Sequence, residues 1–69
     1  MRVKSNLKTL LDERGLSIRG FAKQANLPAE TVRRLYNDDT MQYQRDTIGA
    51  ICKELNVGIG DLLILIDKE

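Results

Sequence analysis

The chain has 69 residues, 42% of them hydrophobic, and a formal net charge of +1, which is typical of one globular domain covering residues 1–69. A core this small rarely supplies more than roughly 3–5 kcal/mol of stability, and it leaves no room for a large ligand pocket. The sequence lacks an apolar stretch approaching the roughly 20 residues of a membrane span, and it lacks a secretory signal segment. The lone Cys52 cannot form an internal disulfide, so we expect a cytoplasmic protein.

Two helices are predicted in the first 25 residues. Ser5 or Asn6 can cap the first helix, which ends at Arg14 and Gly15 because a basic last turn followed by glycine is a common helix end. Ser17 is a good cap for the second. The apolar residues expected to be buried in the two helices are Leu7, Leu10, Leu11, Ile18, Phe21, Ala22 and Ala25.

Residues 17–37 have the pattern of two short helices joined by a tight turn. Asn26 suits the turn because asparagine tolerates left-handed backbone angles. Pro28 suits the first position of the third helix, which runs from there to about residue 37. Val32 and Leu35 share the inner face of that helix. Its outer face is left with Ala29, Glu30, Arg33 and Arg34. The pattern is typical of a helix-turn-helix reader of the DNA major groove.

The remaining chain predicts a polar loop over residues 37–45 and two more helices. Asp46 or Thr47 opens the fourth helix, and a short fifth helix is expected at about 61–63, after Gly58 and Gly60. The expected inner face of the fourth helix consists of Ile48, Ile51, Cys52 and Leu55. Because free cysteines are commonly buried, Cys52 is expected to be a core residue.

The two ends of the chain have strand-like sequences. Residues 1–4 alternate apolar and basic side chains, and residues 64–66 are a branched, strand-prone run. The ends can pair as a two-stranded ribbon, which would hold termini that usually fray. Four successive apolar residues, 63–66, cannot all face inward on a strand. We expect pairing within the chain, and a contribution of this segment to a dimer is the alternative.

Charge is divided unevenly along the chain. Residues 2–34 hold eight lysines and arginines against three acids, a net of +5, whereas residues 35–69 hold three against seven, a net of −4. This division is consistent with one basic face for an anionic partner, although scattered solvated charge is the alternative.

The sequence resembles the lambda repressor/Cro-like helix-turn-helix family, also called the XRE family, over nearly the whole chain. The resemblance rests on Leu10, Leu11, Gly15, Leu16, Ser17, Phe21, Ala22, Asn26, Leu27, Thr31, Val32, Arg34, Leu35, Tyr36, Asn37, Asp46, Thr47, Ile48, Ile51, Cys52, Leu55, Gly60, Asp61, Leu62 and Leu63. It implies an all-α, five-helix DNA-binding domain and a transcriptional regulator, with repression favoured. It also implies a homodimer on a two-fold symmetric operator of double-stranded DNA.

Three positions depart from the family pattern. Ile18 stands where a phosphate-binding glutamine is usual, and Asn26 replaces a common glycine. Asp38 also replaces a glycine and is followed by a second acid, Asp39. Two carboxylates near a loop that normally lies along the DNA backbone are expected to be repelled by phosphates.

The resemblance places the third helix in the major groove and implies base contacts from Ala29, Glu30, Arg33 and Arg34. Arg34 suits guanine, because its planar fork can donate two bonds. Glu30 can accept from cytosine or simply stabilise the first helical turn, and Arg33 can contact phosphate instead of a base. The expected backbone contacts are Arg19, Lys23, Thr31, Asn37, Thr40, Gln42, Tyr43 and Gln44.

Enzymatic chemistry finds little support. The chain has no histidine and one cysteine, so it lacks the usual residues of a zinc site or an activated nucleophile. We expect no enzyme activity, cofactor, small-molecule ligand or membrane association. Two functions remain open: a sequence-specific DNA-binding regulator, and a protein-interaction module of the same fold, such as an antitoxin or a modulator of another regulator.

Overall fold

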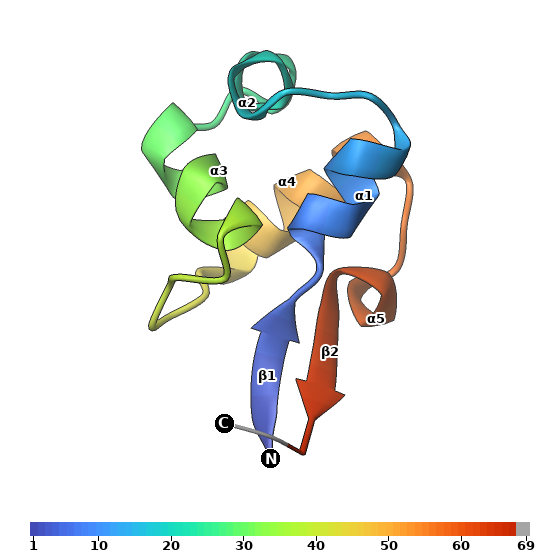
Figure 1. The fold of residues 1–69 in the computed structure, drawn as a ribbon. Coiled ribbons are helices and arrows are strands. Elements are labelled where there is room, and N and C mark those ends of the chain that lie inside the picture. The colour runs from blue at the N-terminus through green and yellow to red at the C-terminus, as the bar shows by residue number, and fades with distance from the viewer. Residues whose placement is uncertain (68–69) are drawn as a thin grey trace.

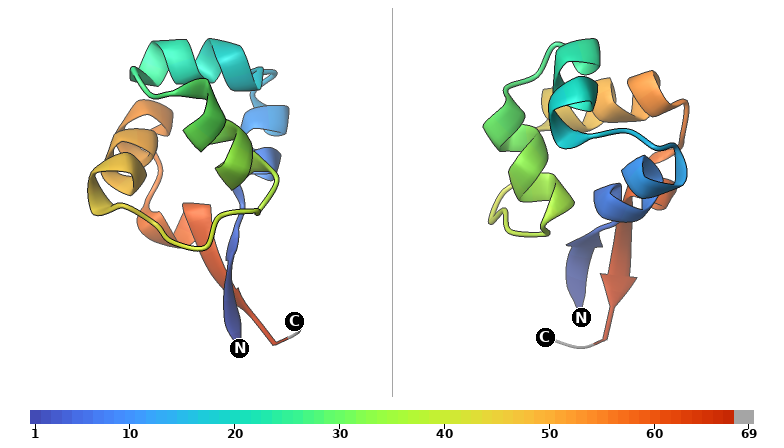
Figure 2. Two further views of the ribbon diagram at one scale, coloured as in Figure 1. Left: turned by 90° about the vertical axis from the view of Figure 1, so that its left-hand side faces the viewer. Right: turned by 45° about the horizontal axis from the view of Figure 1, so that its top comes forward.

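A computed structural model describes residues 1–67, and within them the chain forms five helices and two strands. In chain order the elements are β1 (Arg2–Ser5), α1 (Leu7–Glu13), α2 (Ile18–Ala25), α3 (Ala29–Tyr36), α4 (Arg45–Leu55), α5 (Ile59–Leu62) and β2 (Leu63–Ile66). The helices form one body, and the two strands project from it as a ribbon with the N-terminus at its tip (Figures 1 and 2). The predicted five-helix fold with a terminal ribbon is confirmed.

Local sequence signals set most helix ends. The Ser17 hydroxyl accepts a hydrogen bond from the Gly20 N–H at 2.9 Å and so caps α2 as predicted. Asn26 ends α2 with a left-handed φ of 59°, and Gly15 follows α1 with a φ of +66°. Pro28 precedes α3 as its N-cap instead of lying inside the helix. The fixed φ of proline fits both the N-cap and the first helical position, so the sequence could not show which of the two Pro28 occupies.

Two predicted boundaries were wrong. α4 begins at Arg45, with Gln44 as its N-cap, rather than at Asp46 or Thr47. α5 covers 59–62 rather than 61–63 because Gly58 is its N-cap and Asp61 lies in its first turn. The Asp61 carboxylate accepts from the Gly58 N–H at 3.0 Å, which fixes where the helix starts.

The core joins all five helices. Its largest fully buried side chains are Phe21, Leu7, Leu11, Ile51, Leu62 and Val32. Ile18 and Ala25, expected to be buried, pack against this core only in part. Cys52 is also half-buried and packs against the core only in part. It lies at an apolar groove of about 430 Å³ that Ile48, Ile59 and other residues line.

β1 and β2 pair in antiparallel register, from Arg2 opposite Ile66 to Ser5 opposite Leu63. Alternation along the strands puts Val3 and Leu65 on one face of the ribbon. Val3 is 39% exposed and Leu65 is 64% exposed, so this face carries apolar side chains that the helices do not cover.

Candidate nucleic-acid interface

The helices α2 and α3, joined by the left-handed turn at Asn26, form the predicted helix-turn-helix. α3 buries Val32 and Leu35 against the core and turns its opposite side to solvent. In the left view of Figure 2, α3 lies at the front of the molecule, and the segment that follows it runs below the helix. Packing against α2 therefore holds α3 in place while its outer side stays accessible.

The outer side of α3 carries three exposed charged side chains, Glu30, Arg33 and Arg34. The Arg33 guanidinium donates to the Glu30 carboxylate one turn away, and Arg34 Nε lies 3.7 Å from its other oxygen. Ala29 was also expected on the outer face of this helix, but it is half-buried and packs in part against the core. The structure thus brings together three of the four expected base contacts.

A groove of about 340 Å³ lies beside α3, between this helix, the segment after it and the start of α4. Six residues expected to contact DNA line it together: Thr31, Arg34, Thr40, Gln42, Tyr43 and Gln44. Thr40 donates to the Gln42 carbonyl at 2.7 Å, which orders the turn between them. Arg34 is therefore the residue that connects the outer side of α3 to this groove.

Three other expected backbone contacts lie outside this groove. Arg19 and Lys23 are exposed, four residues apart on α2, and so share one side of that helix. Asn37 is exposed at the end of α3. Thr47, which sequence reasoning missed, lines the groove and donates to Gln44 Oε1 at 3.4 Å. Its position in the first turn of a helix, next to a polar loop, could have indicated this place from the sequence.

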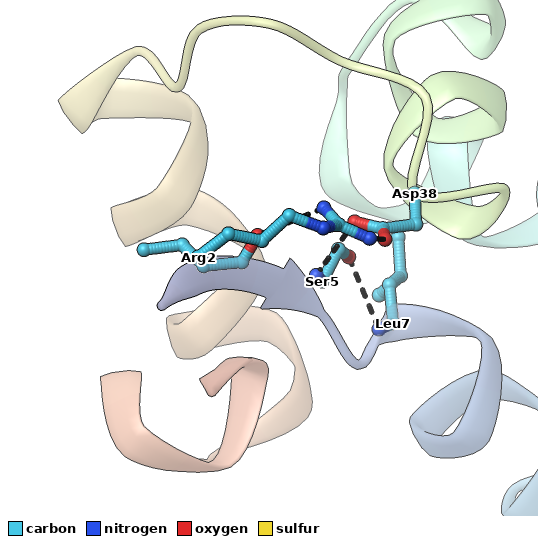
Figure 3. Close-up of polar contacts among 5 residues, drawn as sticks. Arg2, Ser5, Leu7 and Asp38 are labelled. Atoms are coloured by element: carbon cyan, nitrogen blue, oxygen red, sulfur yellow. Dashed lines mark hydrogen bonds and ion pairs between the residues drawn. The ribbon is translucent and has the colours of Figure 1, made fainter. Parts of the chain in front are cut away.

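Asp38, one of the two acids expected near the loop after α3, contacts β1 and does not line this groove. Its carboxylate accepts from the Ser5 N–H at 2.9 Å and from Arg2 at 2.9 Å, and Figure 3 shows these contacts between the segment after α3 and β1. Burial raises the pKa of the Asp38 carboxyl, but the hydrogen bonds from Ser5 and Arg2 outweigh this effect, so the net pKa is lowered. Asp38 is thus paired within the protein, and the Arg2 guanidinium offsets one of the two negative charges expected to repel phosphates.

Asp38 adopts a left-handed φ of 56°. Asparagine and aspartate tolerate this conformation better than most residues, so Asp38 serves the turn where the family has glycine. Burial, followed by the nearby Asp38 charge, raises the pKa of Tyr43. Tyr43 also lines the groove, so the end of α3, β1 and the groove adjoin one another.

A second contact ties α3 to α1. The Tyr36 hydroxyl donates to Asp12 at 2.8 Å, and Lys8 pairs with the same carboxylate at 2.9 Å. The hydrogen bond from Lys8, and then that from Tyr36, lowers the pKa of Asp12. Lys8 also lies 5.3 Å from the centre of the Tyr36 ring. The carboxyl end of α3 is thus held from two sides, by α1 and by β1.

Among residues 1–67, no helix is long and apolar enough to cross a membrane. Over the same residues, no group of three or more cysteine, histidine or acidic side chains is placed to hold a metal ion.

A short helix held across a second one, with exposed arginines beside a groove, is the arrangement typical of a helix-turn-helix DNA-binding domain. Residues 6–68 match the family profile described as the Cro/C1-type HTH DNA-binding domain, and the chain belongs to this family. The curated proteins include no match to this chain.

Among solved structures, the chain is similar to the crystal structure of a protein from Bacteroides fragilis that is described as a candidate DNA-binding protein. The TM-score is 0.77 at 22% sequence identity, and the match covers 91% of this chain and 100% of that one. At this identity the likeness supports the fold, and the family match is what makes DNA the partner.

Proposed function

We propose that the protein is a transcriptional repressor that binds double-stranded DNA sequence-specifically, with α3 in the major groove. The observation that carries this proposal is Arg34, which is exposed on α3 and also lines the groove formed with the following segment. From this position its guanidinium can reach a guanine edge while neighbouring polar groups meet the backbone. A domain that occupies its operator can repress by excluding other proteins from the same DNA.

The expected contacts divide into contacts to bases and contacts to the DNA backbone. Arg34 donates to guanine, and Arg33 binds phosphate or a neighbouring base. The backbone contacts come from Thr31, Thr40, Gln42, Tyr43 and Gln44 around the groove, from Arg19 and Lys23 on α2, and from Asn37 at the end of α3. Ala29, being half-buried, contributes at most a small apolar contact.

Alanine variants of the two arginines test these roles. Arg34→Ala is expected to weaken binding to the preferred duplex about 10-fold or more and to relax its sequence preference, because a bidentate base contact is worth about 1–3 kcal/mol. Arg33→Ala is expected to weaken binding to all duplexes alike and to lower the salt slope by about one. Lys53→Ala, an exposed change near the end of α4, is the control. Equal effects of all three variants would contradict the proposal.

We further propose that two copies bind a two-fold symmetric operator and pair through β2. A two-stranded ribbon is marginal alone and has open edges. β2 is the apolar run Leu-Ile-Leu-Ile, whereas β1 carries Arg2 and Lys4. A second copy offers the same apolar edge, and antiparallel pairing of β2 with its symmetry mate creates a four-stranded sheet across a two-fold axis. In such a dimer the two α3 helices would bind about 34 Å apart along the duplex.

Analytical ultracentrifugation tests this dimer. The charge introduced by Leu65→Asp is expected to shift the protein to monomer and to weaken operator binding. Ile59→Asp is the matched control, because Ile59 is 62% exposed, close to the 64% of Leu65, but lies on α5. Loss of the dimer in the Ile59 variant alone, or a wild type that is monomeric on and off DNA, would contradict pairing through β2.

A further inference from the structure

Glu30 places a negative charge on the outer side of α3, between two residues proposed to contact DNA. Both of its carboxylate oxygens are engaged: one accepts from Arg33 and the other lies 3.7 Å from Arg34 Nε. It is the only acid in α3, whose sequence is Ala-Glu-Thr-Val-Arg-Arg-Leu-Tyr. The protein without DNA thus holds the two arginines on one carboxylate.

Two carboxylates at the carboxyl end of α3 have partners that are not proposed to contact DNA. Asp38 is paired with Arg2 and with the Ser5 N–H, and Asp12 is paired with Lys8 and Tyr36. Glu30 differs because its partners are the residues that DNA would take. An approaching duplex must therefore compete with Glu30 for both arginines.

We propose that Glu30 is a specificity-determining residue that weakens binding to non-cognate DNA, an inference that rests on the proposed DNA-binding role of α3. The two ion pairs are exposed, with 65% of the Glu30 side chain accessible, so the arginines can exchange them for DNA at little cost. The carboxylate then stays behind, facing a polyanion without a partner. At DNA sites that offer no hydrogen-bond donor to Glu30, this repulsion has no compensation.

A cognate site compensates for the lost ion pairs. The exocyclic amine of cytosine can donate to the Glu30 carboxylate while guanine accepts from Arg34, so every charged group regains a partner. Sites that lack a donor at that position leave the carboxylate unpaired. Discrimination here comes from a penalty on wrong sequences as well as from attraction to the right one.

The test compares wild type, Glu30→Gln and Glu54→Gln on two probes at one salt concentration. Glu54→Gln removes the same charge from an exposed position on α4 and is the matched control. The probes are a random-sequence duplex and the duplex that wild type selects from a random pool. Circular dichroism melts establish that each variant is folded before binding is measured.

Glu30→Gln is expected to bind random duplex at least about threefold more tightly than wild type, because one exposed charge pair has an energy of this size. It is also expected to lose the sequence preference at one base pair of the selected site. Glu54→Gln should stay close to wild type on both probes. The inference is overturned if Glu30→Gln binds random duplex no more tightly than Glu54→Gln, or if it weakens both probes equally. Wild type that binds DNA without sequence preference would contradict both the proposed function and the role of Glu30 in specificity. If wild type is sequence-specific but Glu30→Gln behaves like Glu54→Gln, only the inference about Glu30 fails. Absence of binding by all three folded proteins would overturn both.

Discussion

Replacing Asp38 by alanine tests how the end of α3 is fastened to the terminal ribbon. The Asp38 side chain is 16% exposed, and its carboxylate accepts hydrogen bonds from the Ser5 N–H and from Arg2. Ser5 is itself only 3% exposed, so its N–H has little access to water as a substitute partner. Asp38→Ala removes both contacts and puts alanine at a φ of 56°.

Three terms set the expected loss of stability. An orphaned, largely buried N–H costs about 1–3 kcal/mol, and the partly exposed ion pair with Arg2 contributes about 0.5 kcal/mol. Alanine in the left-handed region costs about 1 kcal/mol more than aspartate. The total of about 2.5–4.5 kcal/mol is large for a domain whose core supplies roughly 3–5 kcal/mol. Asp38→Ala should therefore be close to unfolded at 25 °C.

Urea unfolding followed by circular dichroism at pH 7 measures this loss. Asp38→Asn keeps an acceptor for the Ser5 N–H and tolerates the left-handed turn, so it should cost less than about 1 kcal/mol. Asp38→Gly loses the same hydrogen bonds as alanine without its backbone strain, and should be about 1 kcal/mol more stable than Asp38→Ala. A free energy of unfolding of Asp38→Ala within about 0.5 kcal/mol of wild type would show that these contacts do not fasten α3 to the ribbon, as would an asparagine variant that loses as much stability as alanine.

Further predictions concern pH, the helix turn and the thiol. The pKa values of Asp12 and Asp38 are lower in the folded than in the unfolded protein. The stability that these two carboxylates contribute should therefore be fully present above their unfolded pKa of about 3.9, and it should be lost as pH falls through their folded pKa values. Urea midpoints between pH 7 and pH 3 check this, and Asp38→Asn should flatten the curve. Asn26→Ala should cost about 1 kcal/mol and Asn26→Gly almost nothing, as measured by thermal unfolding, since φ is 59°. Burial, then the Asp61 charge, raises the pKa of Cys52, so its thiol should be alkylated more slowly in the folded than in the urea-unfolded protein at pH 8.

Local signals made most of the fold predictable. Apolar spacing gave the buried faces of α1, α3 and α4, and Ser17 and Asn26 gave the ends of α2, because these effects act within a few residues of the chain. The start of α5 was missed because the Asp61 carboxylate accepts from the Gly58 N–H, three residues earlier, so Asp61 lies inside the helix and does not begin it. The ribbon was predicted because two strand-prone ends of one short chain have few other partners.

The candidate site was predictable only in composition. Arg34 and the polar residues after α3 could be named from the sequence, but their common groove depends on how that segment folds back toward α4. The partners of Asp38 are 33 and 36 residues away, at Ser5 and Arg2, so no local pattern indicated that its charge is neutralised. The Glu30 ion pairs were within reach of sequence reasoning, since spacings of three and four residues bring helix side chains together.

The central claim is that α3 binds duplex DNA sequence-specifically. Selection from a random duplex pool by the folded protein, followed by affinity measurements on the selected duplex across salt concentrations, tests it most directly. We expect a two-fold symmetric consensus with half-sites about one helical turn apart, bound with an affinity that falls steeply as salt rises. A folded protein that enriches no sequence, or whose preferred duplex binds no more tightly than random DNA, would contradict it.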